Sequence, residues 1–273
     1  PKGQVGIIMT DYKASKRIVG TSSERESLAT AVKFDAQGVS SDPSGSGATL
    51  TASLTIGNNS NRVLIVTAGS YNQSPTISGI TWTPSGGSAE ALTQSVTDIT
   101  GSDGRSDLWY LINPTIGSGT VTCTWSSDAG VKRRVGGMSF YNVNQSSPIG
   151  VTNAVDGSGT TVSGTITPTT TGSAIVDSVM WLTGGGSETA EHTLGWKTLI
   201  NGDRLHGSQY NLSPTINSAN SMQYANGQSA GWAWVGVEIK CQNQVGIQTN
   251  SIFEDSTNGK HYIWSGSAWT EVA

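Results

Sequence analysis

Acidic side chains are the residues of this chain whose type could support hydrolysis. Asp177 stands in the apolar segment 174–179 and Glu238 in the segment 231–240, and both segments have strand-like composition. A glycosidase needs two carboxylates roughly 5–10 Å apart across a cleft. Neither residue has a second carboxylate at a readable spacing, and a buried aspartate is more often a hydrogen-bonded structural group. We therefore assign no catalytic residue and predict that the chain is not an enzyme.

Two short segments contain potential metal ligands. His192 directly follows Glu191, so in a strand their side chains would point to opposite faces, whereas a metal needs three or more converging ligands. Asp103 and Asp107 lie in a loop that could hold a structural Ca²⁺, but Arg105 separates them and the EF-hand pattern is absent. We predict no metal site and no cofactor, and leave Ca²⁺ near Asp103 and Asp107 as an open alternative.

The two cysteines, Cys123 and Cys241, are too few for a metal quartet or a disulfide framework. Cys123 lies in the alternating segment 120–125, where a small buried hydrophobe is expected. We expect free thiols. A bridge between the two stays open, because nothing in the local sequence argues for it.

Aromatic residues form the most informative pattern. In the segment 231–240, Trp232, Trp234 and Glu238 share one face of a strand, and the aliphatic residues between them share the other. The aliphatic face is the better core face, which leaves the two indoles on the opposite surface. Exposed aromatic patches mark interfaces or sugar platforms. These three residues are therefore a candidate subunit interface or glycan platform, unless another part of the chain covers them.

The composition predicts an all-β fold. Gly supplies 35 of the 273 residues and charged residues only 12%, while nine Trp, seven Tyr and a net charge of −4 argue against disorder. Apolar residues alternate with Thr and Ser over residues 49–56, which is the period of a strand with one dry face. Short strands with turn signals between them continue to residue 243. The pattern predicts a two-sheet antiparallel, jelly-roll-like β-sandwich over residues 31–243.

The two ends of the chain differ from this middle zone. Residues 1–30 are rich in charge and form an N-terminal arm, and residues 244–273 form a small hairpin module in which Asn258 and Gly259 favour a tight turn. Three short strands have little core of their own. The aromatic residues of the module are therefore possible assembly contacts: Phe253, Tyr262, Trp264 and Trp269.

Charge and hydropathy limit the partners and the location. The mild acidity argues against nucleic acid, and no window approaches the roughly 20 apolar residues of a membrane span, so we expect no membrane insertion. The N-terminal residues 1–4 carry no secretory apolar region. A chain that begins with Pro is what removal of an initiator Met leaves, so we expect synthesis in a cytoplasm without a signal peptide.

Four segments of the middle zone, 60–66, 106–114, 136–148 and 233–239, together resemble a β-sandwich domain of bacteriophage virion proteins and their bacterial relatives. The C-terminal residues 253–264, with 268–269, look like the short hairpins of phage fibre and capsid-accessory proteins. These are signatures of a fold and carry over no catalytic residue.

The resemblance implies a virion structural protein, either an external capsid decoration or head fibre or a tail-fibre component. It would be made in the host cytoplasm and located in the virion. Its partners would be other virion proteins and copies of itself in a homo-oligomer, with a host-surface glycan as a further candidate. The alternative is a lectin-like carbohydrate-binding module. The surroundings of Trp232 and Trp234 distinguish the two: a covering chain favours the structural protein, and a groove favours the lectin.

Overall fold

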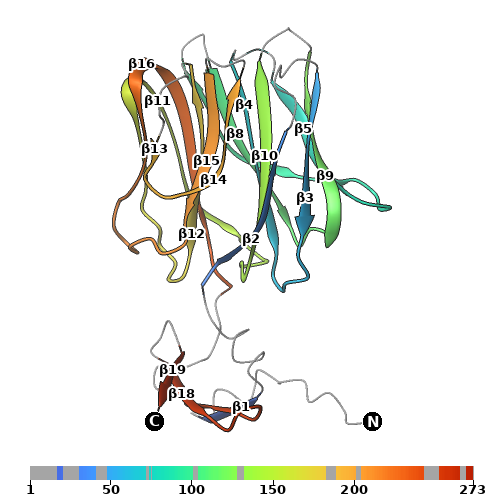
Figure 1. The fold of residues 1–273 in the computed structure, drawn as a ribbon, viewed down its shortest axis with the longest axis vertical. Helices are drawn as coiled ribbons and strands as arrows, with labels where there is room; N and C mark the ends of the chain where they lie inside the picture. The colour runs from blue at the N-terminus through green and yellow to red at the C-terminus, as the bar shows by residue number, and fades with distance from the viewer. Residues whose placement is uncertain are drawn as a thin grey trace. The chain divides into compact units, whose positions relative to one another are not determined.

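The computed structural model describes residues 17–20, 31–40, 48–71, 74, 76–100, 104–127, 132–182, 189–200, 204–242, 252–264 and 269–272. Every regular element among these residues is a β-strand, and all paired strands but one pair run antiparallel, which confirms the all-β prediction. The chain divides into two compact units, Val32–Cys241 and the combination of Pro1–Ala31 with Gln242–Ala273. Figure 1 shows the strands of both units.

The larger unit contains three sheets where the sequence analysis expected two. The five-stranded sheet has the order β2 (Lys33–Val39), β10 (Arg133–Tyr141), β4 (Val63–Ser70), β8 (Gly104–Ile112) and β7 (Thr93–Thr100). The four-stranded sheet has the order β3 (Thr49–Ile56), β9 (Gly117–Trp125), β5 (Ile77–Pro84) and β6 (Glu90–Ala91).

The six-stranded sheet contains the longest strands of the chain. Its order is β11 (Ile149–Ile166), β16 (Asn220–Ile239), β12 (Ala174–Trp181), β15 (Arg204–Asn211) and β14 (Thr193–Ile200), and the short β13 (Thr189–Ala190) pairs with β16. In Figure 1 the six-, five- and four-stranded sheets follow one another from left to right across the larger unit.

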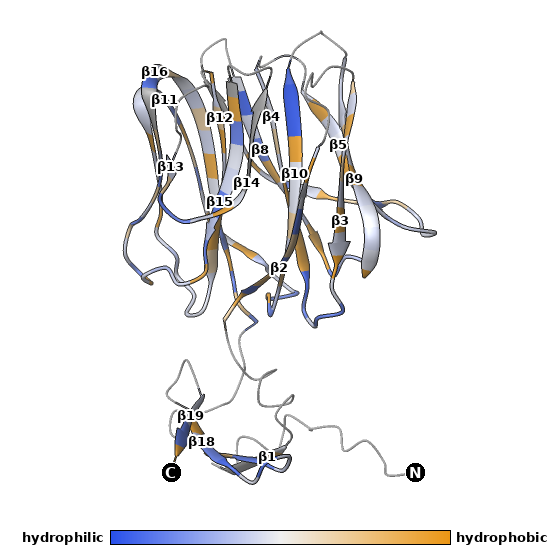
Figure 2. Ribbon diagram, in the orientation of Figure 1, coloured by the Kyte–Doolittle hydropathy of each residue, from blue (hydrophilic) through white to orange (hydrophobic). Residues whose placement is uncertain are grey.

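The five-stranded sheet lies between two cores. On β4, Val63 and Ile65 belong to a first core shared with β12 and β16, whereas Leu64 and Val66 belong to a second core shared with β3, β5 and β9. Both faces of β4 are therefore buried, as the apolar run of its sequence predicts. β10 is buried on both faces as well, although it begins with two arginines, and its hydrophilic start is visible in Figure 2.

The predicted alternation of residues 49–56 is confirmed on β3, where every second residue is buried. Its inward residues Leu50 and Leu54 meet the inward residues Val121 and Cys123 of β9 in the second core. The outward positions of both strands are Thr and Ser. This sheet therefore has one apolar face toward the five-stranded sheet and one polar face toward solvent.

A third core lies on the far face of the six-stranded sheet. It gathers Val179 and Trp181 of β12, Trp232 and Trp234 of β16, and residues from the other half of the long β11–β16 hairpin. In that other half, residues 220–225 of β16 pair with β11 and β13 and with no other described strand, because β12 ends opposite Trp232. The residues it contributes are Val162 and Ile166 of β11 and Met222 and Tyr224 of β16. The hairpin thus curls back over its own sheet and covers it.

The smaller unit joins both ends of the chain in one sheet. β1 (Arg17–Gly20) pairs in parallel with β17 (Ile252–Asp255), which continues antiparallel into β18 (His261–Trp264) and β19 (Trp269–Val272). The expected hairpin is present, with Gly259 at a positive φ of 70°. The strands are joined by five residues instead of a two-residue turn. Apart from β1, residues 1–30 of the expected arm lie outside the described residues.

Candidate functional site

Trp232, Trp234 and Glu238 do share one face of a strand, as the sequence indicates, but that face is buried. Trp234 and Glu238 have no exposed surface and Trp232 is 7% exposed. The expectation of an exposed interface or glycan platform at these residues is therefore wrong, and the alternative that another part of the chain covers them holds. The half of the β11–β16 hairpin that includes Val162 and Tyr224 covers the two indoles, and the β11–β12 connection lies against Glu238. Glycine makes the close approach of the hairpin possible, since a Cβ at Gly164 would collide with the Trp234 indole.

Asp177 is the buried carboxylate at the centre of this third core. Its Oδ1 accepts hydrogen bonds from the Tyr224 hydroxyl at 2.6 Å and the Gln209 backbone N–H at 3.0 Å. Its Oδ2 accepts from Trp234 Nε1 at 2.9 Å and Gln209 Nε2 at 3.0 Å. Burial raises the pKa of Asp177 to about 6, against the opposite effect of these four donors. The carboxylate links both halves of β16 to β12 and β15, which is a structural role.

Glu238 is bound mainly by backbone N–H groups, whereas three of the four donors to Asp177 are side-chain groups. Its carboxylate accepts backbone N–H groups of Val151 at 3.2 Å, Thr169 at 3.0 Å and Thr170 at 2.8 Å. Burial alone would raise the pKa of Glu238, but these donors and the Ser173 hydroxyl hold it below its ordinary value. Glu238 therefore fastens the β11–β12 connection to β16 as an ionised group.

Asp107 lies on β8 and forms an ion pair with Arg105 of the same strand, so it is not a loop residue as the sequence suggested. The guanidinium donates to the carboxylate through Nε at 2.5 Å and a terminal nitrogen at 2.8 Å, and Gln94 Nε2 adds a third bond at 3.0 Å. Burial raises the pKa of Asp107, and Arg105 opposes that shift. Asp103 lies outside the described residues. Among the residues that the structure describes, no three His, Cys, Asp or Glu side chains gather to hold a metal.

A buried chain of hydroxyl and imidazole groups was not foreseen from the sequence. Ser106 on β8 donates to Ser178 on β12 at 2.8 Å, and the Ser178 hydroxyl lies 3.0 Å from His206 Nε2 on β15. Burial lowers the pKa of His206 to about 3, with a further contribution from Arg134. Leu108 and Val176 belong to the first core. Ser106 and Ser178 are two positions away from them on the same strands, so the alternation of a strand could have predicted that both serines point into that core. All three residues are fully buried and join the two large sheets.

The other chemically notable residues also have internal partners. His192 lies in the turn between β13 and β14, where Nε2 lies 2.9 Å from the Ser221 carbonyl oxygen. Cys123 and Cys241 do not form a disulfide, and both are buried. Cys241 Sγ donates to the Thr171 carbonyl at 2.8 Å, and burial raises the pKa of its thiol to about 11. Burial likewise raises the pKa of Cys123 well above its ordinary value.

One face of the small terminal sheet carries buried aromatic rings, and the other face carries both aliphatic and polar residues. Phe253 is fully buried, Tyr262 nearly so, and the Phe253 and Trp269 rings lie 5.6 Å apart. The expectation that these rings remain for assembly contacts is wrong for Phe253 and Tyr262, while the side chain of Trp264 lies outside the described residues. The opposite face exposes three aliphatic residues, Val19 at 55%, Ile252 at 39% and Val272 at 41%. It also exposes the polar residues His261 and Thr270.

The register places these three aliphatic residues on the same face. Val19 lies opposite Glu254, which lies opposite His261, which in turn lies opposite Val272. Directly paired residues share a face of a sheet, and Ile252 is two positions from Glu254 and so points the same way. This face of the small sheet therefore carries exposed aliphatic residues from both ends of the chain, with Glu254 and His261 between Val19 and Val272.

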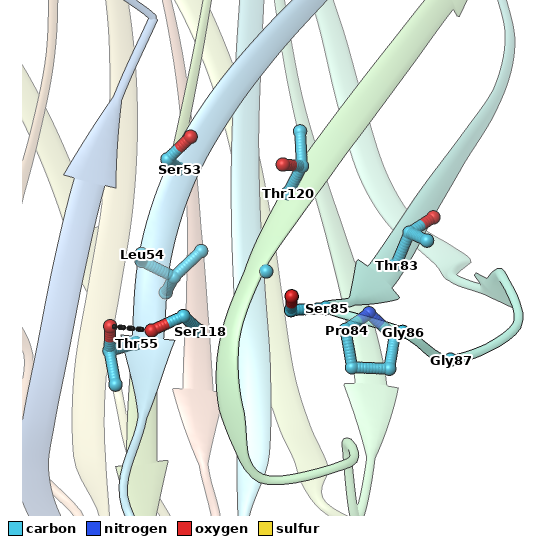
Figure 3. A pocket seen from close by; sticks show the side chains of 11 residues that line it. Ser53, Leu54, Thr55, Thr83, Pro84, Ser85, Gly86, Gly87, Ser118 and Thr120 are labelled. Carbon is cyan, nitrogen blue, oxygen red and sulfur yellow. Dashed lines mark hydrogen bonds between the residues drawn. The ribbon is translucent and has the colours of Figure 1, made fainter.

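A shallow hollow of about 630 Å³ lies on the outer face of the four-stranded sheet. Figure 3 shows hydroxyl groups of three neighbouring strands and of the turn after β5 facing it. The residues that line it carry no charge and no aromatic ring: Ser53, Leu54, Thr55, Thr83, Pro84, Ser85, Gly86, Gly87, Ser118, Gly119 and Thr120. We call this surface the hydroxyl hollow.

No family model matches this chain, and no curated protein matches it. Within the described residues, no helix has the length and apolar composition of a membrane span.

Proposed function

We propose that this chain is a non-catalytic structural protein of a virion. It serves as an external capsid decoration or head fibre, or as a tail-fibre component, and assembles with other virion proteins and with copies of itself. The virion context comes from the resemblance of the four segments of the middle zone. The architecture of a large all-β body and a small terminal sheet is compatible with an attachment role.

The observation that carries the proposal is the set of exposed aliphatic residues on one face of the small sheet. Val19, Ile252 and Val272 are exposed there beside Glu254 and His261, and exposed apolar residues rimmed by polar ones mark protein contacts. The three residues come from both ends of the chain, so a partner bound there would hold both ends. The carboxylates of Asp177 and Glu238 are in contrast already occupied by donors of the chain itself.

The proposal predicts that the full-length chain co-purifies with particles. Mass spectrometry of gradient-purified virions from the cells that make it should detect it in a fixed ratio to the coat proteins. The variant Val19→Lys/Val272→Lys should lower both that ratio and the oligomer mass measured by light scattering, because two charges would be placed in the apolar contact.

Val39→Lys provides the matched control, since Val39 is 37% exposed but lies on β2 of the larger unit. It should leave incorporation unchanged. A wild-type chain that stays free of particles, or a double variant that incorporates as the wild type does, would contradict the proposal.

We further propose that the five- and six-stranded sheets are the jelly-roll-like two-sheet sandwich and that the four-stranded sheet is an added layer. The first core supports this assignment, because Val63 and Ile65 of one sheet meet Val235 and Val237 of the other. Opposed apolar faces of two sheets are the core of a sandwich. A crystal structure in which these two sheets do not face each other would contradict the assignment.

The alternative function, a carbohydrate-binding module, cannot rest on Trp232 and Trp234, because both indoles are buried. A glycan would need a different surface of the molecule. The hydroxyl hollow is the surface that offers polar groups in a regular arrangement.

A further inference from the structure

We propose that the hydroxyl hollow binds a neutral polysaccharide chain. The proposal rests on the alternative function, a carbohydrate-binding module, and names its ligand class and its site. It differs from the aromatic platform expected from the sequence, because the binding groups are aliphatic hydroxyls on the opposite side of the larger unit.

The register of three strands arranges the hydroxyls in rows. Ser53 of β3 lies opposite Thr120 of β9, which lies opposite Thr83 of β5. In the next row Thr55 lies opposite Ser118, and their hydroxyl oxygens are 2.9 Å apart. Neighbouring strands are separated by roughly 4.8 Å, and outward residues along one strand by roughly 6.7 Å. The hollow therefore presents hydroxyls in a regular grid, and Figure 3 shows the side chains of Ser53, Thr120 and Thr83 on three neighbouring strands.

The chemistry of this grid matches that of a sugar. Each Ser or Thr hydroxyl donates one hydrogen bond and accepts up to two, and the hydroxyls of a pyranose do the same. Thr methyl groups add small apolar contacts for the C–H groups of a sugar ring. The lining contains no cation that would favour an acidic polysaccharide and no carboxylate that would favour a cationic one. Charge complementarity therefore selects a neutral glycan.

The shape favours a chain over a single sugar. A volume of about 630 Å³ lies within the usual range of small-molecule sites. The grid continues past the hollow, where Thr51 lies opposite Thr122 and Thr49 opposite Thr124. At the other end, a Cβ on Gly86 would meet no atom within 4 Å. A polymer can thus extend beyond the hollow in both directions.

Affinity electrophoresis of the full-length protein tests the proposal. Native gels would contain dextran, mannan or galactomannan as neutral probes, or alginate as an anionic probe. At least one neutral polysaccharide should retard the protein, and alginate should not. The variant Thr83→Val/Thr120→Val keeps the side-chain shape and removes two hydroxyls. It should weaken the apparent affinity about tenfold.

Two further variants sharpen the result. Ser118→Arg fills the hollow at an exposed position and should abolish retardation, whereas Thr165→Val removes an exposed hydroxyl from β11 and should have no effect. Circular dichroism confirms that each variant is folded. The proposal is overturned if no neutral polysaccharide retards the protein, if alginate retards it equally, or if the double variant binds as the wild type does. Incorporation into particles is read separately, so either proposal can fail alone.

Discussion

The two outer sheets of the larger unit differ in their outward faces: one is apolar and covered, and the other is polar and open to solvent. The six-stranded sheet carries Ile175, Val179 and Trp234 on its outer face, and the curled half of the β11–β16 hairpin buries them. The four-stranded sheet carries Thr and Ser at the same kind of position, and none of the strands that the structure describes covers them. Alternation with a period of two is present in both sheets. Whether an outward face is covered depends on the chemistry of its residues and on whether strands of the sheet are long enough to continue beyond it and fold back.

The comparison also separates two uses of polar groups. In the covered face a single carboxylate, Asp177, satisfies four donors in a dry environment, where a donor without an acceptor costs about 1–3 kcal/mol. On the open face each hydroxyl can exchange partners with water. Polar groups of the covered face therefore specify the fold, whereas those of the open face remain available for a ligand.

Removal of the Asp177 carboxylate should give the largest effect. Asp177→Ala removes the carboxylate that accepts from the Tyr224 hydroxyl, Trp234 Nε1 and Gln209. We therefore expect a loss of roughly 3–5 kcal/mol in the free energy of unfolding. Urea denaturation followed by tryptophan fluorescence measures it. Asp156→Ala, at an exposed position of β11, should change stability by less than about 0.5 kcal/mol. Equal effects of both variants would remove the distinction between the covered and open faces.

The pH dependence of stability tests the same carboxylate. The pKa of Asp177 is about 6 in the folded protein, above its ordinary value of 3.8, so between these values the folded chain binds more protons than the unfolded chain. The free energy of unfolding should therefore fall as pH rises from about 4 to about 6, by roughly 3 kcal/mol from this group. Above that window the group contributes no further change.

Asp177→Asn removes the titrating group and isolates its contribution. Subtraction of its pH profile from that of the wild type should leave the predicted fall. Glu238 has a lowered pKa and contributes stability that is lost as pH falls, but its slope is common to both proteins and cancels. A difference profile that is flat between pH 4 and 6 would show that Asp177 does not titrate there.

The sequence predicted the strands well because their burial follows from local alternation. Residues 49–56 and the two faces of residues 231–240 could be assigned from the period alone. The covering of Trp234 could not, because it depends on the bend of β11 and β16 and on contacts between Trp234 and Gly164, 70 positions away in the sequence. The parallel pairing of β1 with β17 is equally non-local.

The candidate sites show the same limit. Asp177 could be singled out as a carboxylate in an apolar segment, but its donors Tyr224 and Gln209 come from two other strands. In the sequence, nothing beyond the frequent Ser and Thr residues indicates the hydroxyl hollow. Only the register of β3, β9 and β5 brings Ser53, Thr120 and Thr83 into one row.

Two glycine substitutions compare the covered face with the open face, and their expected effect on the free energy of unfolding is smaller. A Cβ at Gly164 of β11 would overlap the Trp234 indole, whereas a Cβ at Gly79 of β5, on the open face, would meet no atom within 4 Å. Gly164→Ala should therefore lower the free energy of unfolding by about 2 kcal/mol through overpacking. Gly79→Ala should leave it unchanged or raise it by up to about 1 kcal/mol, because alanine restricts the unfolded chain.

The same urea titrations measure both changes, and Trp234→Phe provides the coupling test. If the indole is the obstacle, the cost of Gly164→Ala should be smaller in the Trp234→Phe background than in the wild type, since a smaller ring leaves more room. If the cost were the same in both backgrounds, the hairpin would not lie against Trp234. The covered face would then be held by other contacts, and the contrast with the open sheet would lose its physical basis.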